Sequence, residues 1–153
     1  MKVYQTTDAE LITNLNKDVH DLHVNLYPEY FKPYNSEEIQ SFFQGLVDKA
    51  EYVFLVLEDA DIPLGFAMLE IRAYPETIFK KSYQSVYVHQ LGVNATKRGK
   101  GYGSFLMKEI EKLAKEHEIH QIELDYWSNN EEAKNFYKKN DYDIHREFVF
   151  KRV

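Results

Sequence analysis

One segment in the second half of the chain constrains the fold more than any other. A β-branched and aromatic run, Tyr83–Val93, leads into a basic loop, and an amphipathic helical pattern begins near Tyr102. Such a run is typical of a strand, and apolar residues three or four apart are typical of a helix. The sequence therefore predicts a strand, a tight loop and a helix N-terminus. The glycines of this loop and of the helix start are Gly99, Gly101 and Gly103.

The physical chemistry of this segment predicts an anion cradle. Glycine permits a positive φ and lets a ligand approach the backbone, because it has no Cβ. The first N–H groups of a helix lack intrahelical acceptors, and the helix dipole adds partial positive charge there. Lys97, Arg98 and Lys100 contribute full charges. We therefore expect this loop to bind a phosphate or pyrophosphate group.

Two common phosphate-binding motifs do not match. A Walker A loop requires Gly-Lys followed by Ser or Thr, whereas here Gly99-Lys100 is followed by Gly101. A dinucleotide fingerprint requires G-x-G-x-x-G, and these glycines follow G-x-G-x-G. A basic turn that merely joins two elements is the alternative interpretation.

The pattern Arg98-x-x-Gly101-x-Gly103 after a strand resembles the acyl-CoA-binding motif of the GCN5-related N-acetyltransferase (GNAT) family. A second motif, Asn-x-x-Ala-x-x-Phe-Tyr over Asn130–Tyr137, resembles the helix that follows the fifth strand of that family. One departure is that Asp141-Tyr142 stands where the family often has Gly-Phe. Asp tolerates a left-handed backbone better than most residues, so a helix end there is still expected.

The order of predicted elements is β-α-α-β-β-β-α-β-α-β-β. It indicates a single three-layered α/β (α+β) domain with a mixed sheet over residues 1–153. This agrees with the α-β-α GNAT-like fold that the resemblance implies. The predicted strands are Lys2–Thr6, Tyr52–Leu57, Leu64–Tyr74, Tyr83–Val93, Gln121–Trp127 and a final pair within Tyr142–Arg152. The predicted helices begin after Thr7 or Asp8, at Asn35 (to about Asp48), at Tyr102 (to about His117) and at Glu131 (to about Lys139).

Composition narrows the class of protein. With 153 residues, 44% of them hydrophobic, the chain suits one globular domain. The absence of cysteine excludes disulfides, thiolate metal sites and a Cys nucleophile. A net charge of −6 disfavours nucleic-acid binding and suits a cationic substrate. We expect a soluble cytoplasmic protein without a membrane segment, since no stretch approaches ~20 apolar residues and no signal-peptide core is present.

The resemblance implies acetyl-CoA as cosubstrate and assigns residues to it. In the family, the backbone of the fourth strand bonds the pantetheine arm, and an amide near Leu91 would steady an oxyanion by ~3 kcal/mol. Asn130 is expected as a helix cap, a coenzyme ligand, or both. The implied coenzyme contacts are Leu91, Gly92, Val93, Arg98, Gly99, Lys100, Gly101, Tyr102, Gly103, Ser104, Asn130 and Tyr137.

The resemblance also implies direct transfer to an amine, because the chain has neither Cys nor a G-x-S-x-G elbow. Tyr137 is the candidate general acid, with an ordinary pKa of about 10, close to that of an alkyl thiol; plain packing is its alternative. Glu70 and His89 are candidate bases, although Glu70 could instead pair with Arg72. Asp125, Tyr87 or a water relay are further possibilities.

The sequence leaves the acceptor undefined. The leading hypothesis is an N-acetyltransferase for a small amine or a protein amino group; the alternative is a non-catalytic CoA-binding sensor or assembly module. The aromatic residues of Tyr27–Tyr34 are expected to cover an acceptor or to pack in the core. His20 and His23 lack a third ligand, so no metal is predicted. A homodimer is possible, through exposed aromatic residues and the C-terminal strands.

Overall fold

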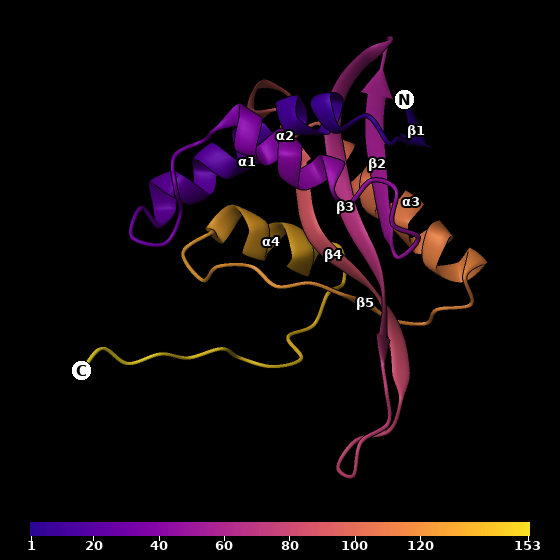
Figure 1. The fold of residues 1–153 in the computed structure, drawn as a ribbon. Helices are drawn as coiled ribbons and strands as arrows, with labels where there is room; N and C mark the ends of the chain where they lie inside the picture. Colours follow the sequence, from indigo (N-terminus) through magenta and orange to yellow (C-terminus); the bar gives the residue numbers. More distant parts are fainter.

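The computed structural model describes residues 1–153, and its centre is a twisted five-stranded sheet in the order β1-β2-β3-β4-β5 (Figure 1). The strands are β1 Lys2–Gln5, β2 Tyr52–Asp59, β3 Ile62–Tyr74, β4 Tyr83–Val93 and β5 Ile122–Glu123. The helices are α1 Ala9–Leu26, α2 Ser36–Gln44, the short 3-10 turn η1 Ala95–Lys97, α3 Tyr102–Glu116 and α4 Glu131–Lys139.

The first four strands are antiparallel, and only the last pair is parallel. β2 and β3 form a hairpin whose two turn residues, Ala60 and Asp61, have φ of 50° and 60°. Two positive φ values are the signature of the type I′ turn that suits strand twist. β5 pairs with β4 only at Val86↔Ile122 and Tyr87↔Glu123. Beyond this point β4 and the segment that follows β5 diverge, which opens the sheet on the side of the predicted site.

Each face of the sheet is covered by its own core. Alternation along β3 sends Phe66 and Met68 towards α1 and α2, and Ala67 and Leu69 towards α3. The first core consists of Ala9, Ile12, Phe43, Val47, Phe54, Phe66 and Met68. The second consists of Leu55, Leu57, Ala67, Leu69, Val86, Val88, Leu106, Met107, Ile110, Leu113, Ala114 and Ile119. The predicted three-layer α-β-α arrangement is therefore confirmed.

The predicted helix boundaries rest on observed caps. Asp8 accepts a hydrogen bond from the N–H of Leu11 at 3.0 Å, and Asn35 accepts one from Glu38 at 3.1 Å. At the end of α4, Asp141 has φ of 62°, and the N–H of Tyr142 bonds the Tyr137 carbonyl at 3.0 Å. The left-handed helix end expected at Asp141 is thus confirmed.

Three elements differ from the prediction by more than two residues. The final strand pair within Tyr142–Arg152 does not form, and this segment is extended without a ladder partner. It contains no glycine, proline or asparagine, and its one aspartate, Asp143, lies at its start, so the middle of the segment lacks the residues that favour a tight hairpin turn. The strand predicted over Gln121–Trp127 forms a ladder only at Ile122–Glu123, because β4 diverges from it. The second helix ends at Gln44 rather than Asp48, and irregular turns follow.

None of the helices combines the length and the apolar character that a membrane crossing requires.

The α3 core provides a test of packing. Leu106 is fully buried beneath the sheet, so Leu106→Ala removes its burial energy and leaves a cavity. We expect a loss of about 2–5 kcal/mol in the free energy of unfolding, measured by urea denaturation. Ile78→Ala is the control: Ile78 is 90% exposed, and a change above about 0.5 kcal/mol there would contradict this account.

Candidate active site

The loop between β4 and α3 has the backbone of an anion cradle. Gly99 and Gly101 have φ of 78° and 83°, and no other atom lies within 4 Å of a Cβ built on either. Gly101 is the N-cap of α3 and supplies no side-chain hydrogen bond. Glycine is favoured at both positions, because other residues adopt such φ values at a cost of ~1–2 kcal/mol.

Consecutive backbone donors in this loop have no protein acceptor. No N–H of residues 99–104 bonds another protein group, although neighbouring Thr96 and Lys97 do bond Asn94. Lys97 and Lys100 stand beside these donors, and neither forms an ion pair. The N-terminal dipole of α3 adds to their positive potential. The residues present therefore fit a phosphate or diphosphate group.

Arg98 and Tyr102 use their side chains to fix the loop. Arg98 Nε donates to the Val93 carbonyl at 3.3 Å, and its Nη1 reaches Glu132 Oε2 on α4, also at 3.3 Å. The Tyr102 hydroxyl donates to Asp59 at the end of β2 over 2.8 Å. The side chains of both predicted cofactor residues thus join the loop to neighbouring elements, so their backbone groups are what remains for a ligand.

Leu91, Gly92 and Val93 are paired with β3, and this part of β4 has no strand on its other side. A Cβ at Gly92 would lie 3.1 Å from the Phe66 ring and 3.4 Å from Val19 on α1. The absence of a side chain at Gly92 is therefore explained by the close approach of the Phe66 ring and of α1. The open edge of β4 is the part of this strand that a ligand arm can pair with.

Tyr137 lies on α4 among other aromatic rings. It stacks on Tyr126 with centroids 5.9 Å apart, and Phe136 and Tyr142 contact it edge-on. Burial, with a smaller effect of the Asp125 charge, raises the pKa of Tyr137 to about 12. Its hydroxyl donates to no protein group. The phenol is therefore protonated at neutral pH and free to donate.

Asn130 caps α4, as predicted. Its Oδ1 accepts from the N–H of Ala133 at 3.0 Å, and the residue is 8% exposed. Its own N–H donates to the Trp127 carbonyl at 2.8 Å. The Nδ2 amide has no protein acceptor, so capping leaves one side-chain donor unused.

The two motifs meet in space. A Cβ at Gly103, in the first turn of α3, would lie 2.9 Å from Phe136 of α4. The small residue thus allows α4 to pack directly against the start of the cradle helix. Together with the Arg98–Glu132 contact, this packing brings the helix of Tyr137 beside the anion cradle.

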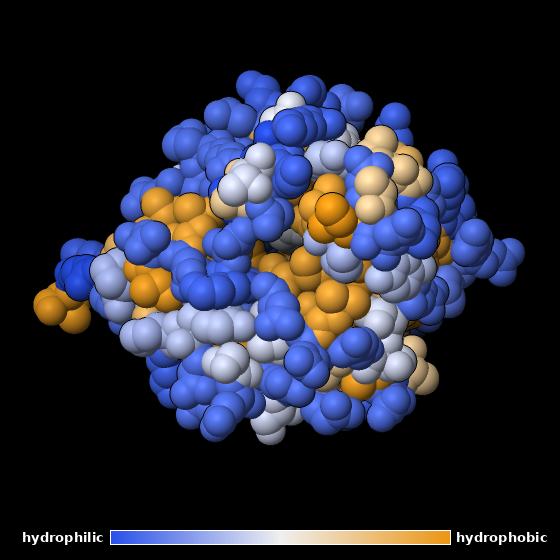
Figure 2. All heavy atoms as spheres, turned by 90° about the horizontal axis from the view of Figure 1, so that it is seen from above, coloured by the Kyte–Doolittle hydropathy of each residue, from blue (hydrophilic) through white to orange (hydrophobic).

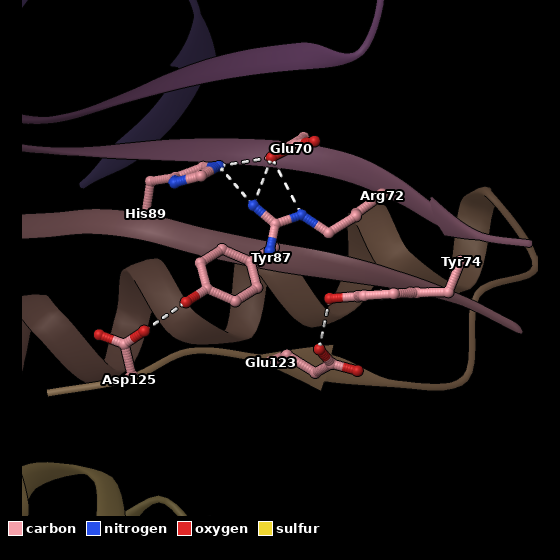
Figure 3. A network of polar contacts seen from close by, with 7 residues as sticks. All are labelled: Glu70, Arg72, Tyr74, Tyr87, His89, Glu123 and Asp125. Atoms are coloured by element: carbon pink, nitrogen blue, oxygen red, sulfur yellow. Dashed lines mark hydrogen bonds and ion pairs between the residues drawn. The ribbon is translucent and has the colours of Figure 1, made fainter. Parts of the chain in front are cut away.

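A polar network of β3 and β4 side chains lies on the face of the sheet to which Phe66 and Met68 point (Figure 3). Glu70 Oε2 accepts from Arg72 Nη2 at 2.8 Å and contacts His89 Nε2 at 2.6 Å. The hydrogen bond from Arg72 is the largest cause of a lowered pKa for Glu70, and the His89 contact adds to it. The structure thus brings both candidate bases together, with the predicted Arg72 pairing also present.

Tyr87 and Asp125 extend this network towards the open edge of β4. The Tyr87 hydroxyl donates to Asp125 at 2.5 Å, and the Arg72 guanidinium lies 3.9 Å above the Tyr87 ring. Burial and Asp125 raise the pKa of Tyr87 to about 12. The sequence analysis named these residues but did not predict that they form one network. The pairing of Glu70 with Tyr87 across the long β3–β4 hairpin could have indicated it.

The predicted aromatic segment gathers around a residue that sequence reasoning did not assign, Trp127. Its ring lies 4.5 Å from Tyr27, 5.5 Å from Tyr30 and 5.3 Å from Phe31, between ring centroids. The Tyr27 hydroxyl also accepts from the N–H of Asn129 at 2.9 Å. These contacts tie the end of α1 to the loop before α4.

The two histidines of α1 bond the backbone. His20 contacts the Lys32 carbonyl and His23 the Val19 carbonyl, each at 2.7 Å. No group of three or more His, Asp or Glu side chains has an arrangement that could hold a metal ion.

A mixed sheet that opens beside a glycine-rich anion cradle, with a half-buried tyrosine on the next helix, is the arrangement of an acyl-CoA-dependent acyltransferase fold. A family model for the acetyltransferase (GNAT) family matches residues 17–142. The chain belongs to the GNAT family, as its motifs indicated. This membership supports acyl transfer from acetyl-CoA as its general activity.

Solved structures share the fold over nearly the whole chain. A tetramutant of the BH1408 protein from Bacillus halodurans gives a TM-score of 0.93 at 24% identity, covering 100% of both chains. The aminoglycoside N-acetyltransferase AAC(6')-Iy in complex with CoA gives 0.72 at 13%, covering 99% of this chain and 93% of that one. A predicted acetyltransferase with acetyl-CoA from Clostridium acetobutylicum gives 0.71 at 19%, covering 99% and 95%. No curated protein sequence matches the chain.

The lowered pKa of Glu70 predicts how stability depends on pH. A carboxyl whose folded pKa lies below its ordinary value of 4.5 stabilises the fold above that value, and this contribution disappears as pH falls through the folded pKa. The stability advantage of the wild type over Glu70→Gln should therefore shrink between pH 6 and pH 3, measured by urea denaturation. Glu76→Gln, at an exposed position without an ion pair, is the control. Parallel stability curves for wild type and Glu70→Gln would refute the pairing.

Proposed function

We propose that this protein is an N-acetyltransferase that moves an acetyl group from acetyl-CoA directly to a primary amine within a ternary complex. The observation that carries the proposal is the row of free N–H groups over residues 99–104, which suits the coenzyme diphosphate. The open edge of β4 suits the pantetheine arm, since an extended amide chain can pair with a strand edge. The reacting thioester would then lie in the opening between β4 and the β5 segment, on the side of α4.

The transfer requires two proton movements that the protein can assist. The amine nitrogen attacks the thioester carbon, the C–S bond breaks, the amine loses a proton and the thiolate gains one. The chain has no cysteine, so no acyl-cysteine forms and attack is direct. A free backbone N–H of β4 near Leu91 would stabilise the oxyanion of the tetrahedral intermediate.

Tyr137 is the proposed donor to the departing sulfur. Its pKa of about 12 is higher than the ordinary value of about 10 that the sequence argument matched to an alkyl thiol, so proton transfer to the thiolate would be uphill. Apolar surroundings also raise the pKa of a thiol buried beside it, which narrows this gap. The phenol therefore acts first as a hydrogen-bond donor that stabilises the thiolate, and transfers its proton as negative charge on sulfur develops.

His89 is the better of the two proposed bases. Glu70 is kept ionised by Arg72, which makes it a weak base but a good hydrogen-bond acceptor. We place the imidazole proton on Nε2, because its contact with the Glu70 carboxylate, at 2.6 Å, is much shorter than its 3.4 Å contact with the Arg72 guanidinium; Nδ1 is then left to accept a proton. Glu70 would then position His89 and stabilise its protonated form.

Coenzyme binding can be tested at Gly101. Gly101→Ala places a side chain on a residue with φ of 83°, at a strain of ~1–2 kcal/mol, and adds a methyl group on the surface that would contact the diphosphate. We expect the Kd for acetyl-CoA to rise about tenfold by calorimetry. Gly45→Ala is the matched control, since Gly45 has φ of −71°. An equal Kd for wild type and Gly101→Ala would place the coenzyme elsewhere.

Catalysis can be tested at Tyr137. Tyr137→Phe removes only the hydroxyl, so turnover in a thiol-release assay with a panel of amines should fall about tenfold or more, with acetyl-CoA affinity nearly unchanged. Tyr142→Phe, which removes a neighbouring phenol that contacts Tyr137, is the control. Equal turnover in both variants would leave Tyr137 a packing role. Tight acetyl-CoA binding without thiol release for any amine would favour the non-catalytic CoA-binding module instead.

A further inference from the structure

The loop that joins β3 to β4, residues 75–82, carries an exposed apolar tip. Ile78 and Phe79 are both 90% exposed, and neither belongs to a core. Figure 1 shows this hairpin projecting beyond the helices that cover the sheet. At the opposite end of the molecule, apolar and hydrophilic side chains are mixed over the surface (Figure 2). Adjacent apolar side chains at a projecting tip are typical of an interaction surface.

Hydrogen bonds and ring stacking hold the tip in a defined shape. The N–H groups of Phe79 and Lys80 donate to the Thr77 hydroxyl at 3.2 and 3.0 Å, and the Thr77 N–H donates to the Lys80 carbonyl at 2.9 Å. Behind the tip, the rings of Tyr74 and Tyr83 stack with centroids 4.2 Å apart and planes 9° apart. A preorganised loop loses less conformational entropy on association than a mobile one, so this tip is suited to binding.

An open pocket lies at the base of the same hairpin. Its volume is about 560 Å³, and it lies between the hairpin and the loop that follows α3. Its apolar walls include Tyr74, Pro75, Tyr83 and Ile119. A cavity of ~150 Å³ is large enough to hold benzene, so this pocket has room for a phenyl side chain.

The tip and the pocket carry opposite charge. In the tip loop two lysines outnumber one acid, and at the end of α3, beside the pocket, two acids outnumber one lysine. None of these six residues forms an ion pair within the chain; they are Lys80, Lys81 and Glu76 at the tip, and Glu116, Glu118 and Lys115 at the end of α3. The C-terminal carbonyl groups of α3 add partial negative charge on the pocket side. The tip therefore complements the pocket electrostatically.

We propose that the Phe79 tip of one copy of this chain binds in the pocket of a second copy, and that the contact is reciprocal. Tip and pocket lie on one hairpin about four residues apart, roughly 13 Å along an extended strand. A two-fold axis between them places each tip at the other copy's pocket, which closes the assembly as a dimer. Phe79 supplies the apolar burial, while the lysines approach the acidic end of the other α3. Dilution to monomer removes the contact, so the unfolding of tip variants such as Ile78→Ala is measured there.

Disulfide crosslinking tests the location of the contact, because the natural chain has no cysteine. Two single-cysteine chains, Ile78→Cys at the tip and His120→Cys at the pocket, are mixed in equal amounts, oxidised and analysed by mass spectrometry. We expect a linked heterodimer in the mixture and at least about tenfold less linked dimer from either chain alone, since a disulfide forms only between side chains in contact. No link in the mixture, or equal linking in all three samples, would overturn the proposal.

A matched pair of variants tests the apolar contact by sedimentation equilibrium. Phe79→Asp should raise the dimer dissociation constant at least about tenfold, because it places a carboxylate in an apolar pocket beside acidic residues. Ile62→Asp makes a similar change at a residue that is 57% exposed in the β2–β3 hairpin, and it should leave the dissociation constant unchanged. Equal effects of the two variants overturn the proposal, as does a wild-type chain that stays monomeric up to millimolar concentration.

Charge reversal tests the pairing of the lysines with the end of α3. Lys80→Glu with Lys81→Glu should raise the dimer dissociation constant about tenfold. Adding Glu116→Lys and Glu118→Lys to the same chain should bring it back to within about threefold of the wild type, because both partners then carry reversed charge. Circular dichroism checks that each variant keeps the wild-type fold. A folded chain with all four changes that dimerises no better than the lysine variant would contradict the proposed contact.

Discussion

The free backbone donors at the start of α3 are the constraint on which the site depends. A row of N–H groups without acceptors is unfavourable unless water or a ligand satisfies it. Gly99 and Gly101 hold that row open with positive φ values, and Gly101 provides no capping side chain that would compete with a ligand. A structural loop would be expected to cap its helix, as Asp8 and Asn35 do for α1 and α2. The local backbone is therefore better explained by anion binding than by folding alone.

The divergence of β4 and β5 leaves an unpaired strand edge that leads to the anion cradle. Parallel pairing stops at Tyr87 and Glu123, so the strand edge that leads to the cradle has no protein partner. The two faces of the sheet place different chemistry along this opening. Tyr137 approaches with α4 on one side, while the network of Glu70, Arg72 and His89 lies on the other face. In the proposed mechanism, this arrangement puts the acid and the base on opposite sides of the reacting centre, as the two proton movements of acyl transfer require.

Most of the architecture could be predicted from the sequence, because it depends on local signals. Glycine spacing, the caps at Asp8 and Asn35, and apolar periodicity were read directly from the residues. The final strand pair was predicted wrongly, since alternation shows that Tyr142–Arg152 can be a strand and cannot show which edge it joins. The contacts of Trp127 and the Tyr87–Asp125 bond depend on where loops converge, which no periodicity records. The roles of the individual site residues remain predictions.

The two contacts of Arg98 link the glycine-rich motif to the motif on α4. One guanidinium bonds the end of β4 and a carboxylate of α4, so it links the anion cradle to the helix that carries Tyr137. Lysine has one flexible ammonium group and cannot reproduce this planar, two-directional grip. The Arg98 guanidinium then has a scaffolding role: it fixes the spacing between the anion cradle and the helix that carries Tyr137.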